Sequence, residues 1–111
     1  MAFDEDLAQR LREQLAGEDA VTERRMFGGL TFLLHGHMSV TASAQGGLLA
    51  RVDPASAEAL LGAPGVTPME MNGREMTGWL RVAPSAIADD AALSAWVERS
   101  VALVRTLPPK G

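Results

Sequence analysis

The sequence predicts an α+β fold of two layers, in which helices cover one face of an antiparallel sheet of five or six strands. Short segments with period-two alternation are separated by glycine-containing turns, which is typical of strands joined as hairpins. Segments with helical spacing of apolar residues stand near both ends of the chain. Tight connections favour antiparallel pairing with the helices on one face. The length of 111 residues suits a single domain over 1–111.

The first part of the chain predicts one helix and three strands. A helix is expected over 4–16, because leucine recurs there at every fourth position and a glycine follows. A strand is expected over 21–27, where it meets two glycines. Period-two patterns over 30–34 and 38–42 flank Gly36. This arrangement predicts a tight antiparallel hairpin.

The middle of the chain predicts a strand, a short helix and a second hairpin. A glycine-rich turn at 45–47 leads into a strand over 48–52. A short helix is expected over 53–62, with aspartate as its N-cap, proline at its first position and glycine at its end. Strands over 68–71 and 76–82 flank Asn-Gly, the dipeptide preferred in two-residue hairpin turns.

The last element is the helix with the clearest pattern. Asp89 or Asp90 is suited to cap its start, and Pro108-Pro109 prevents its continuation. Its apolar positions follow the i, i+3, i+4, i+7 rule, with Ser100 on the same stripe, and they are Leu93, Trp96, Val97, Val101 and Val104. We therefore expect this side of the helix to pack on the sheet.

Composition and charge argue against several functional classes. The chain has no cysteine, which removes disulfides and thiolate ligands and fits a reducing compartment. The N-terminus is acidic and lacks the pattern of a signal peptide, and every apolar run is too short to span a bilayer, so we expect a cytoplasmic protein without a membrane partner. The net charge of −4 makes direct nucleic-acid binding an unfavoured expectation, since such binding uses clusters of basic residues.

The sequence contains no recognised motif for catalysis or for a cofactor. The G-x-S-x-G elbow, the P-loop and the dinucleotide fingerprint are all missing, so we expect no enzyme, no catalytic residue and no cofactor. His35 and His37 could supply two metal ligands, but the chain has no further histidine or cysteine for a third. We interpret both as exposed residues at a hairpin tip. A small-ligand or weak metal-binding domain using them and Met69, Met71 and Met76 is the alternative function.

The two faces of the predicted sheet differ in their side chains. The face under the helices is expected to carry Phe32, Leu34, Met38, Val40, Leu48, Ala50, Leu80 and Val82. The opposite face carries apolar side chains together with arginine, and the predicted helices leave it uncovered. Patches that combine tryptophan and arginine are typical of interaction surfaces. The candidate partner surface therefore consists of Leu33, Leu49, Arg51, Trp79, Arg81, Arg24 and Arg25.

Two alternatives for this surface stay open. A register shift of one residue would exchange the two faces, and loops could cover Trp79 within the chain itself. Neighbouring residues of a strand point to opposite faces, so Arg24 and Arg25 are not expected to form one patch. A further alternative is direct nucleic-acid binding through the arginines, with Phe27 stacking on a base.

Several blocks of sequence, in this order and spacing, resemble the TfoX N-terminal domain family, the domain shared with the Sxy/TfoX regulators of competence. The blocks are R-R-M-F-G-G over 24–29, the hairpin over 30–38, N-G-R-E-M over 72–76, G-W at 78–79 and W-V-E over 96–98. The resemblance extends over nearly the whole chain.

This resemblance implies an α+β fold of the secretion-chaperone-like kind, without a known catalytic activity, cofactor or metal. It also implies action on transcription through other proteins. The competence regulators usually carry a second, helical domain, and this sequence stops at Gly111 without one. We therefore expect a stand-alone N-terminal domain, and the family name does not fix its part in competence. The expected function is a non-enzymatic protein-interaction module, with an unidentified protein or a second copy of the chain as its partner.

Overall fold

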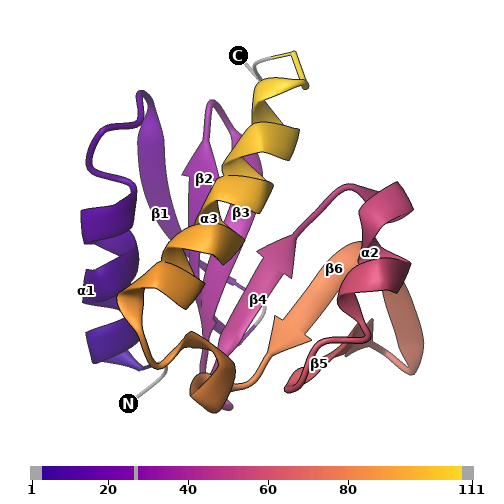
Figure 1. Ribbon diagram of the computed structural model, residues 1–111. Coiled ribbons are helices and arrows are strands. Elements are labelled where there is room, and N and C mark those ends of the chain that lie inside the picture. The colour runs from indigo at the N-terminus through magenta and orange to yellow at the C-terminus, as the bar shows by residue number, and fades with distance from the viewer. Residues whose placement is uncertain (1–3, 27, 109–111) are drawn as a thin grey trace.

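The computed structural model describes residues 4–26 and 28–108, which form one six-stranded antiparallel sheet with helices on one face (Figure 1). This confirms the predicted α+β fold. The strands lie in the order β1-β2-β3-β4-β6-β5. The elements are α1 (Glu5–Gln14), β1 (Val21–Met26), β2 (Gly29–Leu34), β3 (His37–Ser43), β4 (Leu48–Arg51), α2 (Pro54–Leu60), β5 (Val66–Met71), β6 (Arg74–Val82), the 3-10 helix η1 (Pro84–Ile87) and α3 (Asp90–Arg105).

Each α-helix begins at an aspartate whose carboxylate accepts a backbone N–H of the first turn. Asp4 accepts from Leu7, Asp53 from Ala55 and Asp89 from Ala92, at 3.1, 2.9 and 2.7 Å. Such caps satisfy donors that the helix itself leaves unpaired. The predicted starts of the short helix at Asp53 and of the long helix at Asp89 are confirmed. The sequence patterns did not predict η1.

The core fills the space between the sheet and the helices. α3 lies across β3 and β4, and its predicted stripe is buried, Ser100 included. α1 packs beside it with Leu7, Leu11 and Leu15 (Figure 1). From the sheet, the core receives Phe32, Leu34, Val40, Leu48, Ala50, Leu80 and Val82, as predicted. Burying these side chains supplies the main driving force for folding.

The predicted position of Met38 in this core is wrong. The pairing of β2 with β3 shifts between Phe32 and Leu33, so that Val40 pairs with Phe32 but Met38 pairs with Leu33. This β-bulge places one extra residue, Ser39, in β3 and reverses the alternation before it. Ser39 consequently faces α3, while Met38 joins a second apolar cluster on the opposite side of the sheet.

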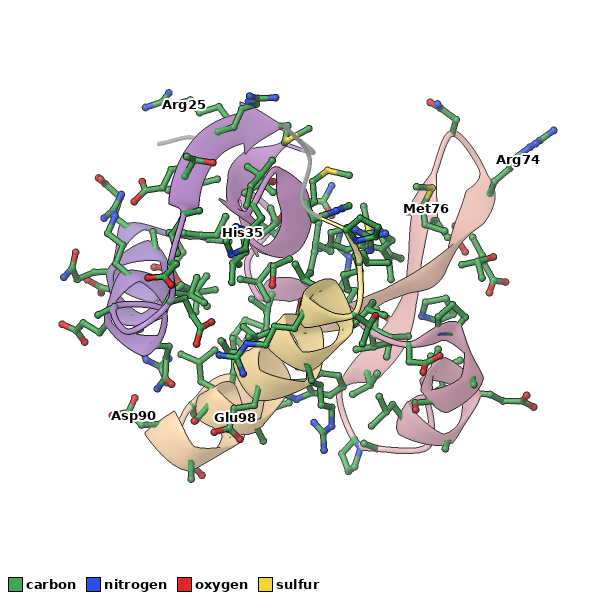
Figure 2. The ribbon with its side chains drawn as sticks, turned by 90° about the horizontal axis from the view of Figure 1, so that it is seen from above. Arg25, His35, Arg74, Met76, Asp90 and Glu98 are labelled. Carbon is green, nitrogen blue, oxygen red and sulfur yellow. The ribbon has the colours of Figure 1, made fainter. Side chains whose placement is uncertain are left out.

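The sheet is curved. Seen from above, β1 on one side and the β5–β6 hairpin on the other rise away from the helices, and Met76 is drawn on the side of the hairpin that faces the other strands (Figure 2). The curvature creates a second, smaller core on the face opposite the helices, where Leu49, Met69 and Trp79 pack with the partly buried Met38 and Met76. Within the described residues, no helix is both long enough and apolar enough to cross a membrane.

Candidate partner-binding face

The face of the sheet opposite the helices, called here the far face, is traced by one row of paired residues. Leu49 belongs to the second apolar cluster, and its partners in the neighbouring strands are Thr41 and Arg81. Thr41 pairs with Thr31, and Thr31 pairs with Arg24 of β1. Paired residues share a face of the sheet, so the row places Arg24 and Arg81 on the far face together with Leu49.

A second row adds Arg51 to the far face. Arg51 of β4 pairs with Trp79 of β6, which lies in the same apolar cluster. Arg51 and Arg81 are diagonal neighbours on adjacent strands, since Arg81 pairs with the residue two positions before Arg51. Diagonal neighbours lie about 7–8 Å apart at their backbones, within reach of long side chains. The far face therefore carries two adjacent guanidinium groups, with Arg24 further along.

The apolar part of the predicted partner surface does not meet solvent. Leu33, Leu49 and Trp79 have exposed fractions of only 5%, 1% and 7%. The expectation that they form an open apolar patch is wrong, and Leu49 and Trp79 are buried because Met69 and other strand side chains pack against them. Trp79 is covered by the chain itself, as one alternative held, but by side chains of neighbouring strands rather than by loops. Met38 and Met76 are half-buried at the border of this cluster and supply apolar surface there.

The arginines of the far face are reachable from solvent and do not make ion pairs with the described carboxylates. Arg24 is exposed, and Arg51 and Arg81 are half-buried. Arg51 donates to the carbonyl of Met38 at 3.4 Å, and Arg81 donates to Ser43 Oγ at 3.2 Å. These neutral acceptors leave the positive charges uncompensated, since a guanidinium has five N–H donors and keeps its charge throughout the accessible pH range.

The helix side of the molecule has the opposite character. Arg12 forms a two-point ion pair with Glu23, with both N–O distances at 2.8 Å. This hydrogen bond to Arg12 lowers the pKa of the Glu23 carboxyl below its ordinary value and raises that of the Arg12 guanidinium. Arg105 pairs with Glu18 at 2.7 Å, and Arg10 pairs with Asp90 at 3.2 Å. All three arginines of these pairs stand on α1 or α3.

The fourteen aspartates and glutamates, all within the described part of the chain, avoid the far face. Most stand on helices, at helix caps or in the turn before β1. Three stand on strands. Glu23 pairs with the core residue Phe32, and its side chain reaches α1. Glu70 and its partner Glu75 stand next to Met69 and Met76 in their strands. Because neighbouring residues of a strand point to opposite faces, the two glutamates point away from the far face. A chain of net charge −4 therefore presents one face whose described charged side chains are all cationic.

The two neighbouring arginines of β1 point to opposite faces, as predicted. Arg24 pairs with Thr31 on the far face, whereas Arg25 pairs with the core residue Leu30. Arg25 lies at the outer end of β1 and extends away from the body of the molecule (Figure 2). It therefore does not share a face with Arg24, Arg51 and Arg81, although it belongs to the same exposed strand. Phe27, predicted as a stacking residue, lies outside the described residues.

The two histidines do not form a joint site. His35 is exposed in the turn, as predicted, with a φ of 51°. The expectation that His37 is exposed is wrong, because it is buried and its Nε2 lies 2.6 Å from the carbonyl oxygen of Pro108. A carbonyl only accepts, so Nε2 carries the proton and donates. Among the described residues, no group of three or more His, Asp or Glu side chains comes together as a metal site.

A separate groove of about 640 Å³ lies on the helix side, between α2 and α3. Its walls are mostly apolar and carry small side chains, among them Ala55, Ala59 and Ala102, with Arg99 also lining it. The guanidinium of Arg99 lies over the ring of Trp96, with its Cζ atom 4.8 Å from the ring centroid. Of the residues proposed for a small ligand or metal, His35, His37, Met69 and Met76 do not line this groove.

The sequence patterns missed three residues of the far face. Met38 was assigned to the wrong face, and Met76 was not assigned to this surface. Arg74 was also missed, although the two-residue spacing from Met76 in β6 indicates the same face; it lies at the tip of the β5–β6 hairpin and points outward (Figure 2). Recognising the bulge at Ser39 would have required a signal that the run Met38-Ser39-Val40-Thr41 does not provide.

Comparison with known families agrees with the fold. A profile described as TfoX N-terminal domain matches residues 13–103, which include all six strands and most of α3. Comparisons with curated proteins and with solved structures returned no match. One feature of the matched region explains why a glycine stands at the start of β2: a Cβ on Gly29 would overlap the carbonyl oxygen of Ala42 in β3. The chain belongs to the TfoX N-terminal domain family.

Proposed function

We propose that this chain is a non-enzymatic protein-interaction module of the cytoplasm, acting in transcriptional regulation, and that it binds its partner through the far face. The observation that carries the proposal is the separation of charge. Arg24, Arg51 and Arg81 share a face that holds no described carboxylate, while three other arginines are paired on the helix side. Unpaired cationic groups beside apolar surface suit an interaction site, where arginine is a frequent source of binding energy.

The apolar contribution comes from methionine rather than from tryptophan. Met38 and Met76 are half-buried at the border of the far-face cluster, so a partner can contact their flexible thioether side chains. Methionine adapts its shape to different partners, which makes it frequent at surfaces that bind protein segments. Trp79 contributes by supporting this surface from below, since it is 7% exposed.

A nucleic acid is the main competing partner, because phosphates also bind arginine. The net charge of −4 and the position of most carboxylates on the helix side work against a polyanion. The described far face has no exposed aromatic ring on which a base could stack, since Trp79 is buried. A protein partner with a local acidic region therefore fits better than a nucleic acid.

Site-specific photo-crosslinking in the producing cell tests the proposal, because it captures a partner whose identity is not yet established. A photoreactive amino acid replaces Met38 on the far face in one variant and Ala102 on α3 in the other. We expect a discrete protein adduct from position 38 and none from position 102. Adducts confined to position 102, or to neither position, would contradict the assignment.

The charge dependence of the adduct provides the control. Arg51→Glu and Arg81→Glu together should abolish the adduct from position 38, because like charges then face the acidic partner. The matched pair Arg99→Glu and Arg105→Glu on α3 changes the net charge equally and should leave the adduct in place. An adduct that nuclease removes would identify a nucleic-acid complex and overturn the proposal.

A further inference from the structure

The two edges of the sheet differ in their ability to accept another strand. At one edge, β5 contains Pro68, which lacks an N–H, and its pairing with β6 shifts between Pro68 and Glu70. Proline and bulges protect an edge against further pairing. At the other edge, β1 pairs with β2 in unbroken register over six residues and contains no proline. No described strand lies on its other side.

The direction of the backbone groups of β1 follows from one hydrogen bond. His35 N donates to Ala20 O at 3.1 Å, which places Ala20 and His35 at a hydrogen-bonding position at the start of the ladder. Such pairs alternate along an antiparallel ladder, so Thr22 and Arg24 bond to β2. The N–H and C=O groups of Val21 and Glu23 therefore point away from the sheet, toward the side where a seventh strand would lie.

A second copy of the chain is a poor occupant of this edge. Two β1 strands related by a two-fold axis pair the largest number of their residues when residue 23 or residue 24 lies at the axis. The first register places Glu23 opposite its own copy, and the second does the same with Arg24. Like charges directly opposite each other destabilise a strand pair. The sequence of β1 thus disfavours self-association while leaving the edge open.

An acidic segment of another protein does not meet this obstacle. Arg24 is exposed, lies on the far face and starts the row that continues to Arg81. A strand added beside β1 would place alternate side chains next to Arg24, and carboxylates at those positions would extend the charge complementarity of the whole face. On the helix side, the Glu23 carboxylate is already engaged by Arg12, so uncharged side chains fit there.

We propose that β1 accepts an extended acidic segment of the partner as a seventh strand of the sheet. This inference rests on the proposed function and adds to it the partner's chemistry and its mode of binding. Main-chain hydrogen bonds to Val21 and Glu23 would supply affinity, and carboxylates beside Arg24 would supply selectivity, as in other cases of strand addition.

Amide hydrogen exchange measured by NMR tests the mode of binding. The probe is a synthetic peptide of about nine residues, long enough for a strand, with glutamate at every second position and threonine or valine between. In the free protein, the amides of Val21 and Glu23 should exchange rapidly, and those of Thr22 and Arg24 slowly. Saturating peptide should slow Val21 and Glu23 by about tenfold or more and leave Thr22 and Arg24 little changed.

Two modified peptides separate strand pairing from charge attraction. N-methylation of those peptide residues whose amides face β1 should weaken binding by about tenfold or more, and N-methylation of the alternate residues should not. On the protein side, Arg24→Glu should weaken binding by about tenfold, whereas Arg99→Glu on α3 should change it by less than about twofold.

The possible failures are distinguishable. Peptide binding without protection of Val21 and Glu23, and with equal affinity of both methylated peptides, would overturn strand addition while the far-face proposal stands. Protection that rises with protein concentration in the absence of peptide would identify a second copy as the occupant and overturn the acidic segment. Absence of peptide binding overturns this inference, whereas the proposed function is tested separately by the crosslinking at position 38.

Discussion

Ser39 on β3 and Ser100 on α3 join the sheet to the long helix through a pair of buried hydrogen bonds. Their hydroxyl oxygens lie 2.7 Å apart, and Ser100 Oγ also donates to the carbonyl oxygen of Ser39 at 2.8 Å. Because the single hydroxyl hydrogen of Ser100 goes to that carbonyl, Ser39 must donate to Ser100 Oγ. Neither residue has measurable exposed surface. The bulge that moves Met38 to the far face thus also places Ser39 where α3 can hold it.

This geometry predicts that the two serines are unequal. Ser100→Ala removes the partners of both the Ser39 hydroxyl and its carbonyl, and should cost about 1–3 kcal/mol in the free energy of unfolding. Ser39→Ala leaves the carbonyl bond intact and should cost less. Urea unfolding of both variants shows which one loses more free energy of unfolding, and the exposed Ser56→Ala serves as the control. A larger loss for Ser39→Ala would contradict this assignment of donors and acceptors.

A second prediction concerns the close approach of β2 to β3 at Gly29. A methyl group at this position would overlap the carbonyl oxygen of Ala42, so Gly29→Ala should lower the free energy of unfolding by about 1–3 kcal/mol or more. Gly17→Ala is the matched control, since a Cβ there meets no atom within 4 Å. Thermal unfolding should show a lowered midpoint for the first variant and a nearly unchanged one for the second; equal midpoints would refute the close approach.

A third prediction follows from the ion pair of Arg12 with Glu23. The hydrogen bond from Arg12 lowers the pKa of Glu23 below its ordinary 4.5, so the pair stabilises the folded state above that value and loses its effect as the pH falls through the lowered folded pKa. Glu23→Gln should therefore be less stable than the natural chain at neutral pH and equally stable in acid below the folded pKa. Urea unfolding at both conditions measures the difference.

Glu13→Gln serves as the control for this pH dependence, because it removes an exposed carboxylate of α1 without removing that ion pair. Its stability relative to the natural chain should change little between the two conditions. A deficit of Glu23→Gln that persists at low pH would mean that the side chain acts through packing rather than through its charge.

Local sequence signals were sufficient for the order and kind of most elements. The aspartates at positions 53 and 89 cap helices as their types suggest, and the Asn-Gly dipeptide turns the β5–β6 hairpin. The stripe of α3 is buried in full because helical spacing determines which side faces the sheet. These features depend on residues close together in the chain, which is why the sequence predicts them.

The burial of the far face depended on longer-range geometry. The alternation rule failed at Met38 because one bulge reverses every side chain before it in the strand. Leu49 and Trp79 were assigned to the correct face, yet they are buried because the curvature of the sheet brings β5 and β6 over that face (Figure 2). Neither the position of a bulge nor the curvature of a sheet follows from the alternation of residue types.

The separation of charge depends on the same geometry. Arginine and carboxylate are interspersed along the sequence, and only the register shows that Arg24 shares a row with Arg81 while Glu23 faces α1. The net charge of −4 gave no sign of a cationic face, because it sums over surfaces that point in opposite directions.

The central claim is that the far-face arginines bind an acidic protein segment, and the affinity of the glutamate-containing peptide for two charge-matched variants tests it most directly. Fluorescence anisotropy should show binding to the natural chain, a loss of about tenfold or more for Arg24→Glu with Arg81→Glu, and a change of less than about twofold for Arg99→Glu with Arg105→Glu on α3. Equal losses in the two variants would mean that only net charge matters, and a greater loss for the α3 pair would place the binding surface on the helix side.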